Sequence, residues 1–153
     1  MERRRFLAAG GLLILGGGRL AGPAQAEELI GADQAVTLAR AAYPEPVTGK
    51  FAFTVQSTGR FGQNLFLNSR EKWQDPDNLA VVIWPEAAET LALRTGLRLD
   101  SLADAFEGRS IQVVGAAKRV WIANPRTKDL GPARKPYFAT NIYVENADRL
   151  GVV

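Results

Sequence analysis

The chain has 153 residues, of which 46% are hydrophobic and 23% charged, and these values are ordinary for a single globular domain. It contains no cysteine and no histidine, which excludes disulfides, thiol nucleophiles, imidazole bases, and zinc or haem sites built on His or Cys ligands. The formal net charge is +3, but residues 1–26 hold four basic side chains and one acidic one, so the rest of the chain carries fifteen of each and is neutral.

Residues 1–26 have the pattern of a secretory signal. Three arginines at residues 3–5 precede an apolar, glycine-rich run at residues 6–18, and the Ala-Gln-Ala of residues 24–26 suits a signal cleavage site. The run is too short and too rich in glycine for a membrane span, and Arg-Arg-x-Phe-Leu resembles the twin-arginine export signal. We expect cleavage after Ala26 and a periplasmic or secreted mature protein. The alternative is a basic N-terminal helix that stays on the protein.

Residues 27–46 are expected to form a lead-in and one helix. Asp33 can cap a helix over residues 35–42, where alanine, valine and leucine form an apolar stripe. The two prolines that follow cannot continue the helix, so the chain turns before the next element. Residues 47–153 are treated as the domain proper.

Three strands are predicted next. Residues 50–57 alternate between apolar and polar side chains, and a turn at residues 58–62 leads into a second strand at residues 64–69. Asp, Pro and Asn at residues 75–78 favour a reversal of the chain. Residues 79–84 are an unbroken apolar run, which suits a central strand that is covered on both faces.

A helical insert and two further strands complete the domain. The period becomes helical at residues 85–95, which begin with proline and are followed by glycine, and a second short helix is predicted at residues 100–106. Residues 109–122 are the fourth strand, with a bend or bulge at Gly115, and residues 136–144 are the fifth. The apolar C-terminal tail is expected to pack back on the barrel.

Three short motifs resemble those of OB-fold proteins. They are Phe-Leu-Asn at residues 66–68, Asp-Asn at residues 77–78 before the apolar strand, and Phe-Glu-Gly-Arg at residues 106–109 before the fourth strand. Over residues 50–144, motifs and element order are similar to those of exported bacterial OB-fold proteins and nucleic-acid-binding OB domains. The resemblance implies a mainly β fold with a helical insert (α+β): a five-stranded OB-fold-like barrel, with a helix between strands three and four and an extra N-terminal helix.

In an OB-fold the ligand lies across strands two and three, between two loops. In this chain those loops and their flanks carry basic groups that can meet phosphates and aromatic rings that can stack on bases. Residues 109–135 hold seven basic side chains against one acidic, so an anionic ligand is expected there. Alternatively, the rings are packing residues and the cations keep an exposed loop soluble. The candidate ligand-binding residues are Arg60, Phe61, Phe66, Lys118, Arg119, Trp121, Arg126, Lys128, Arg134, Lys135 and Tyr137.

Two other kinds of site fit the sequence less well. Asp75, Asp77 and Asn78 offer oxygen ligands, but the glycine and terminal glutamate of a calcium loop are absent, so a turn is favoured. Carboxylate pairs within residues 71–89 could serve hydrolysis only in a cleft with shifted pKa values, which no spacing here implies.

The sequence therefore predicts an exported, monomeric binding protein that is not an enzyme and needs no cofactor or metal. Its expected ligand is single-stranded nucleic acid or another anionic polymer. The alternative is a module that binds a protein or an oligosaccharide of the cell envelope, and the least favoured hypothesis is a phosphodiesterase acting on the same face.

Overall fold

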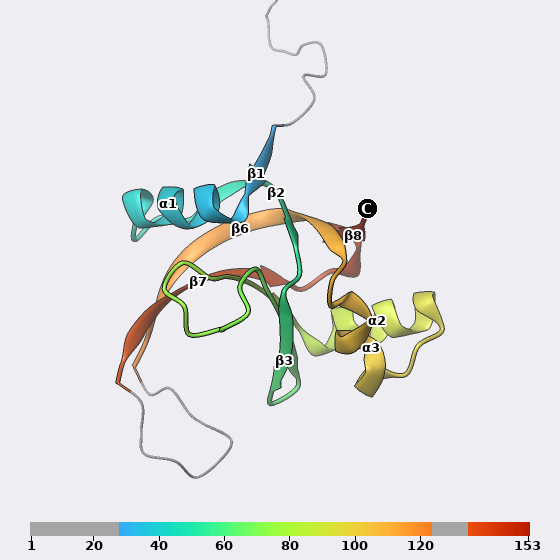
Figure 1. Cartoon of the computed structure of the whole chain (residues 1–153). Coiled ribbons are helices and arrows are strands. Elements are labelled where there is room, and N and C mark those ends of the chain that lie inside the picture. The colour runs from blue at the N-terminus through green and yellow to red at the C-terminus, as the bar shows by residue number, and fades with distance from the viewer. Residues whose placement is uncertain (1–27, 124–134) are drawn as a thin grey trace, which may run out of the picture.

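The computed structural model describes residues 28–123 and 135–153 and shows a strongly curved sheet with helices packed around it (Figure 1). In chain order the elements are β1 (Leu29–Gly31), α1 (Ala32–Ala42), β2 (Val47–Thr54), β3 (Ser57–Phe61), β4 (Asn64–Asn68), β5 (Leu79–Ile83), α2 (Pro85–Thr95), α3 (Leu99–Phe106), β6 (Ser110–Ile122), β7 (Tyr137–Val144), the 3-10 helix η2 (Ala147–Arg149) and β8 (Leu150–Val152).

The strands form one open, mixed sheet. Its hydrogen-bonded order is β1-β2-β6-β7-β5-β4-β3, and β8 pairs with β6. Neighbours are antiparallel except for β1 with β2 and β5 with β7, which are parallel. The expected mainly β fold with helices is confirmed. A closed five-stranded barrel is not shown. The eight strands of the described residues form an open sheet, whose hydrogen-bonded order begins at β1 and ends at β3.

The largest difference from the predicted elements lies in the first strand. Residues 50–57 are not one strand: β2 pairs with β6 up to Thr54, and β3 pairs with β4 from Ser57 onward. In the two residues between them, the N–H of Val55 donates to the Arg109 carbonyl oxygen (2.9 Å), and the N–H of Gln56 donates to the Asn68 carbonyl oxygen (2.8 Å). At Val55 and Gln56 the chain thus changes its pairing partner from β6 to β4.

The turn that follows is shorter than predicted. Arg60 and Phe61 were expected at the tip of a turn at residues 58–62, but both lie in β3 and pair with β4. Only Gly62 and Gln63 connect the two strands, and Gly62 has a φ of 63°, which glycine adopts without the steric cost that a Cβ would add.

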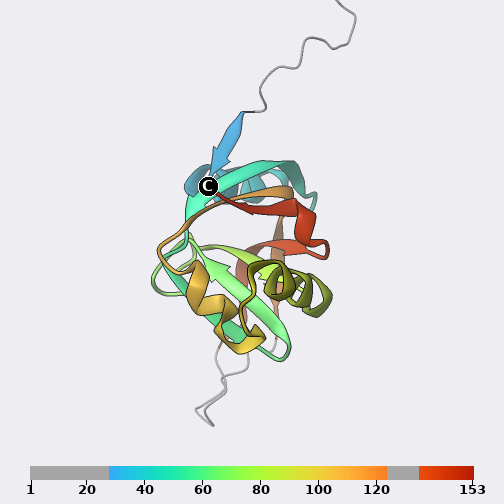
Figure 2. The same ribbon diagram turned by 90° about the vertical axis from the view of Figure 1, so that its right-hand side faces the viewer.

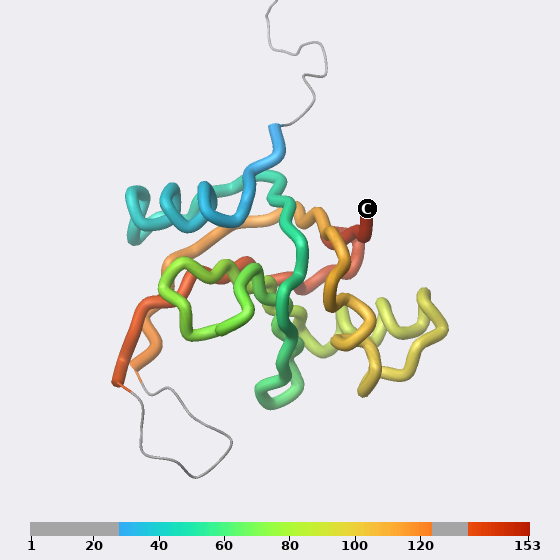
Figure 3. Tube along the Cα trace, in the orientation of Figure 1, coloured from blue at the N-terminus to red at the C-terminus, as the bar shows by residue number. Residues whose placement is uncertain are grey.

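The helical insert and the tail lie close to their predicted places. α2 starts at Pro85, and Gly96 follows it with a φ of 72° and an N–H that donates to the Ala92 carbonyl oxygen. Every residue of β5 is buried. The C-terminal tail returns as β8 alongside β6, as the tube in Figure 3 shows.

One local prediction is wrong, and one of the two alternatives given for Gly115 is excluded. Asp33 does not cap α1: the N-cap is Gly31, no side chain bonds to the helix end there, and Asp33 binds Arg70 instead. There is also no bulge at Gly115, because the partners of β6 on β2 follow one another without interruption. A Cβ at Gly115 would lie 3.0 Å from Cγ2 of Ile142, so this glycine serves close packing between β6 and β7.

The hydrophobic core occupies one face of the strands, here called the inner face. α1 packs beside β2 and β6, whereas α2 and α3 lie on the other side of the molecule beside β3 and β4 (Figures 1 and 2). Removing these side chains from water is the main stabilising term of the fold. The strand residues that are fully buried on the inner face are Phe51, Leu65, Leu67, Leu79, Val81, Ile83, Ile111, Val113, Ala117 and Ile142.

Candidate functional site

The strand register shows which side chains share the face opposite the core, here called the outer face. Residues that pair directly lie on the same face, and neighbours in a strand lie on opposite faces. Phe66 pairs with Gly59 on one side and Val82 on the other, and Val82 pairs with Tyr143. Because Leu65 and Leu67 face the core, this row must face outward.

A set of aromatic rings follows this face from β3 to β7. Phe61 pairs with Asn64 and lies on the same side as Phe66. Trp84 continues the alternation of β5 with an extended backbone, and its N–H donates to the Val144 carbonyl oxygen. Phe61, Trp84 and Tyr143 are 52%, 38% and 40% exposed, and Phe66 is half-buried. We call this surface the aromatic face; its rings are those of Phe61, Phe66, Trp84, Tyr137 and Tyr143.

Polar groups lie in the next row of the same face. Asn141 pairs with Ala80 on one side and with Lys118 on the other, two residues before Tyr143. Asn141 is buried, with 7% of its surface exposed, and its Nδ2 donates to Oη of Tyr143 at 3.2 Å. Lys118 is exposed and makes no ion pair with any described residue.

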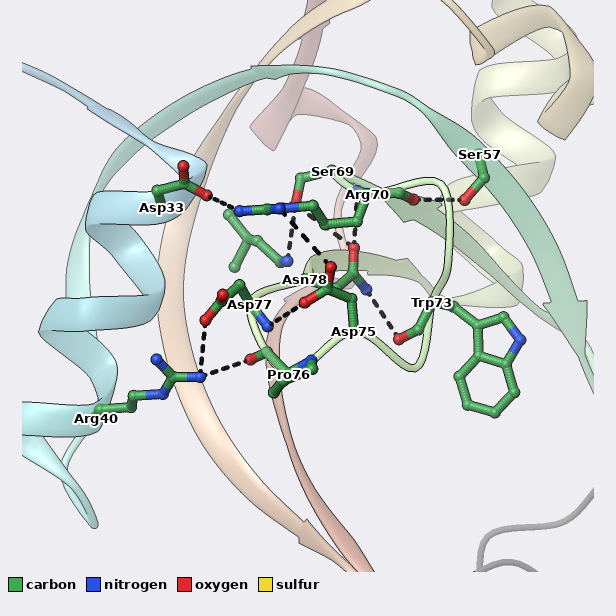
Figure 4. Close-up of polar contacts among 11 residues, drawn as sticks. Asp33, Arg40, Ser57, Ser69, Arg70, Trp73, Asp75, Pro76, Asp77 and Asn78 are labelled. Carbon is green, nitrogen blue, oxygen red and sulfur yellow. Dashed lines mark hydrogen bonds and ion pairs between the residues drawn. The ribbon is translucent and has the colours of Figure 1, made fainter.

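The loop between β4 and β5 places one more ring beside this face. The ring of Trp73 lies 6.3 Å from that of Tyr137 at an interplanar angle of 55°, and Trp73 is itself 41% exposed. The loop is held by Asn78, whose Oδ1 accepts from the Arg70 N–H (3.0 Å) and whose Nδ2 donates to the Trp73 carbonyl oxygen (3.4 Å) (Figure 4). The same Nδ2 also donates to Asn68 Oδ1 (3.1 Å).

The aspartates of this loop make structural contacts. Oδ1 of Asp75 accepts from the N–H of Asp77 at 2.8 Å, which is the local turn that the composition predicts. Arg40 of α1 pairs with Asp77 (3.0 Å), and Arg70 pairs with Asp33 of α1 (2.8 Å), so two ion pairs tie α1 to the loop (Figure 4). The hydrogen bond and charge of Asp33 raise the pKa of Arg70 above its ordinary value.

A second group of rings lies on the opposite side of the β6–β7 hairpin. The guanidinium carbon of Arg119 is 4.0 Å from the centroid of the Phe138 ring and 5.7 Å from that of Tyr43. Tyr43 meets Phe138 edge to face at 5.4 Å, and Trp121 lies 4.8 Å from Phe138. These contacts join the end of α1 to the hairpin, and we call them the Arg119 cluster.

The predicted site residues therefore divide between two faces. Phe61, Phe66, Lys118 and Tyr137 belong to the aromatic face, whereas Arg119 and Trp121 alternate with Lys118 and lie on the other side. Arg60 pairs with Leu65 and also leaves the aromatic face. Lys135 is exposed just before β7. Arg126, Lys128 and Arg134 lie outside the described residues.

The sequence interpretation overlooked Trp84, Asn141 and Tyr143. The alternation of the strands indicated part of this surface. Tyr137, Asn141 and Tyr143 occupy odd positions of one predicted strand and therefore share a face. Trp84 is two residues after Val82 in another predicted strand and lies on the same side as Val82. The pattern alone could not place the two series on one face, because that requires the parallel pairing of β5 with β7.

Two general features bear on the site. Within residues 28–123 and 135–153, no three acidic side chains gather where they could ligate a metal ion. In the same ranges no helix has both the length and the apolar character that crossing a membrane requires.

Comparisons with known proteins give no family. No family model matches the chain, and no curated protein matches it. Among solved structures the chain is similar to a protein of Leishmania major Friedlin described as a "putative aspartyl-tRNA synthetase", with 12% sequence identity and a TM-score of 0.40. The match covers 88% of this chain and 22% of that one, so it spans less than a quarter of that protein's length.

Proposed function

We propose that the chain is an exported binding protein, not an enzyme, with an OB-like barrel that binds single-stranded nucleic acid on its aromatic face. The topology supports the barrel when β2 and β3 are counted as one bent strand. The pairings β3–β4, β4–β5, β5–β7, β7–β6 and β6–β2 then return to the strand from which they started. This is the strand order expected of an OB-fold.

The observation that carries the proposed ligand is the set of rings on one solvent-facing side of the strands. Stacking of a base on an aromatic side chain contributes about 1–3 kcal/mol per base and tolerates any base sequence, since every base has a π-face. Because Phe66 and Tyr143 lie on β4 and β7, which both pair with β5, their positions are set by the sheet and little ordering is needed on binding.

Positive charge is available at the end of the same surface. Lys118 lies on the aromatic face, and Lys135 precedes Tyr137, which is part of it. The connection between β6 and β7 adds Arg126, Lys128 and Arg134 by sequence. Phosphates of an extended strand would be neutralised by such groups, and binding would then weaken as salt is added.

We propose a binding protein and not an enzyme because the side chains that could act in catalysis are either missing from the sequence or engaged in structural contacts. The chain has no histidine or cysteine, and Asp75 and Asp77 are engaged in the turn and in ion pairs with arginines. Export rests on residues 1–26, whose basic start, apolar run and Ala-Gln-Ala end have the pattern of a cleavable signal.

An oligosaccharide of the cell envelope is the second candidate ligand. The amide groups of Asn64 and Asn141 lie on the aromatic face and suit sugar hydroxyls, and Lys118 is a cation that the strand pairings of the described residues place there. Binding of a neutral sugar would be insensitive to salt, whereas binding of nucleic acid would not.

A salt titration with a fluorescently labelled single-stranded DNA 12-mer tests the proposal. We expect the mature protein to bind it at low salt, with an affinity that falls steadily between about 50 and 400 mM salt. Trp84→Ala should weaken binding about tenfold, the loss of one stacked base, and Trp121→Ala is the matched control because that ring is also exposed but lies in the Arg119 cluster. Absence of binding at low salt, or equal losses in both variants, would refute the proposal.

A further inference from the structure

The strongest unexplained feature of the aromatic face is the side chain of Asn141. It is 7% exposed, and Nδ2 donates to Oη of Tyr143. Its Oδ1 has no hydrogen-bond donor anywhere in the part of the chain that the structure describes. Buried side-chain amides are normally paired at both ends, so an open acceptor at this position calls for an explanation.

The neighbours on the sheet do not supply the missing donor. Ala80 pairs with Asn141 on one side and has only a methyl group, while Lys118 pairs with it on the other side and points into solvent without an ion pair among the described residues. The open oxygen therefore lies between a small side chain and a cation, beside the partly exposed ring of Tyr143.

We infer that Oδ1 of Asn141 accepts a hydrogen bond from an N–H group of a nucleobase that lies on the aromatic face; this inference rests on the proposed function. A phosphate group at neutral pH offers acceptors almost exclusively, so it cannot satisfy a carbonyl oxygen. The base edge therefore faces Asn141. Lys118 has three donors and no acceptor, and it takes the phosphate next to that edge.

Tyr143 has two functions in this arrangement. Its ring is 40% exposed and offers a stacking surface. Its hydroxyl accepts the hydrogen bond from Nδ2 of Asn141, which leaves Oδ1 as the amide atom without a partner among the described residues. Asn141 is thus a base-contacting residue, and Tyr143 both stacks and positions it.

Asn141→Leu separates this inference from the proposed function. Leucine has a similar size and no hydrogen-bonding groups. The Tm should change little, because the substitution removes a buried unpaired acceptor and the lost hydrogen bond was made to the hydroxyl of Tyr143, a residue that is 40% exposed and open to water. We measure binding of a labelled dC 12-mer and an abasic 12-mer of equal length. The variant should bind the dC 12-mer about three- to tenfold more weakly than the natural protein, the effect of one hydrogen bond, and the abasic strand equally well. Lys118→Gln is the control, and it should weaken both strands alike.

Three results would decide against the inference. If the natural protein binds the dC 12-mer and Asn141→Leu binds it equally well, the inference is overturned and the proposed function stands. Equal losses with both strands would show that the side chain supports the surface without contacting a base. If the natural protein binds neither strand, both are overturned. If the variant folds poorly, NMR of the natural protein is the alternative measurement. The side-chain amide resonances of Asn141 should shift when the dC 12-mer is added and should not shift with the abasic strand. The absence of a shift with the dC 12-mer would refute the contact.

Discussion

The guanidinium carbon of Arg119 lies 4.0 Å from the centroid of the Phe138 ring, on the opposite side of the sheet from its chain neighbour Lys118. Two adjacent cations of one strand thus have different surroundings. Arg119 packs within the fold between two rings, and Lys118 is exposed on the aromatic face. Basic residues that are close in sequence therefore cannot be treated as one patch.

Arg119→Ala should destabilise the fold and leave ligand binding nearly unchanged. A cation over an aromatic ring contributes about 0.5–2 kcal/mol, depending on how far it is desolvated, so we expect a loss of about 1 kcal/mol in the free energy of unfolding. Lys118→Ala should change stability by less than about 0.5 kcal/mol and should weaken oligonucleotide binding. Urea unfolding and the binding titration check the pair, and the reverse pattern would contradict the assignment of the two faces.

Gly62→Ala should cost about 1 kcal/mol or more of stability. Gly62 has a φ of 63°, a backbone conformation that strains residues with a Cβ. Gly59→Ala is the matched control, because a Cβ there meets no atom within 4 Å and the φ is not positive. It should be neutral or slightly stabilising, since alanine restricts the unfolded chain. Thermal unfolding distinguishes the two, and equal Tm values would show that the turn is not strained.

Asn78→Ala should destabilise the protein by about 2–3 kcal/mol, because it removes several hydrogen bonds and leaves the buried Asn68 amide without its donor. Asp77→Ala, one residue earlier, breaks only the exposed ion pair with Arg40 and should cost less than about 1 kcal/mol. Denaturant unfolding measures both. A large effect of Asp77 and a small one of Asn78 would mean that the ion pair, not the amide, holds the loop.

Asp100 should titrate below the ordinary range for an aspartate. The hydrogen bond from Arg98, and after it the charge of Arg98, lower the pKa of the carboxyl. A folded pKa below the unfolded value means that the pair stabilises the fold above the unfolded pKa, and that this contribution is lost as the pH falls through the folded pKa. NMR titration of the Asp100 carboxyl checks the shift. In Arg98→Gln the pKa should return toward its ordinary value, and an unchanged midpoint would refute the cause.

Replacing Arg3 and Arg4 by lysine should stop export if the chain uses the twin-arginine route. Both arginines belong to the Arg-Arg-x-Phe-Leu sequence near the start of the chain. Fractionation of bacterial cells that express the tagged full chain should then show the protein retained inside the cell. Arg19→Lys is the control and should be exported normally. Export of the double variant at the natural level would rule out this route.

Local features of the sequence were sufficient for several elements. Proline at position 85 and glycine at position 96 bound α2 because each residue has a conformational restriction that acts without distant contacts. The apolar run is buried as predicted over residues 79–83, since such a run cannot be left in water, but its last residue, Trp84, is 38% exposed. The division of the first strand was not predictable in this way, because the bend at Val55 and Gln56 depends on hydrogen bonds to Arg109 and Asn68, which are distant in sequence.

The composition and the order of the chain by themselves determined its class: a mainly β domain with helices, without cysteine or histidine chemistry, preceded by a segment with the pattern of an export signal. Only the tertiary structure decided which rings share a surface. Phe66 and Tyr143 lie on β4 and β7, and Trp84 directly follows β5. Lys118 and Trp121 lie on opposite faces although they are only three residues apart in β6. The physical reason is the pleat: side chains alternate between two faces, and only pairing with neighbouring strands brings residues from distant segments onto the same one.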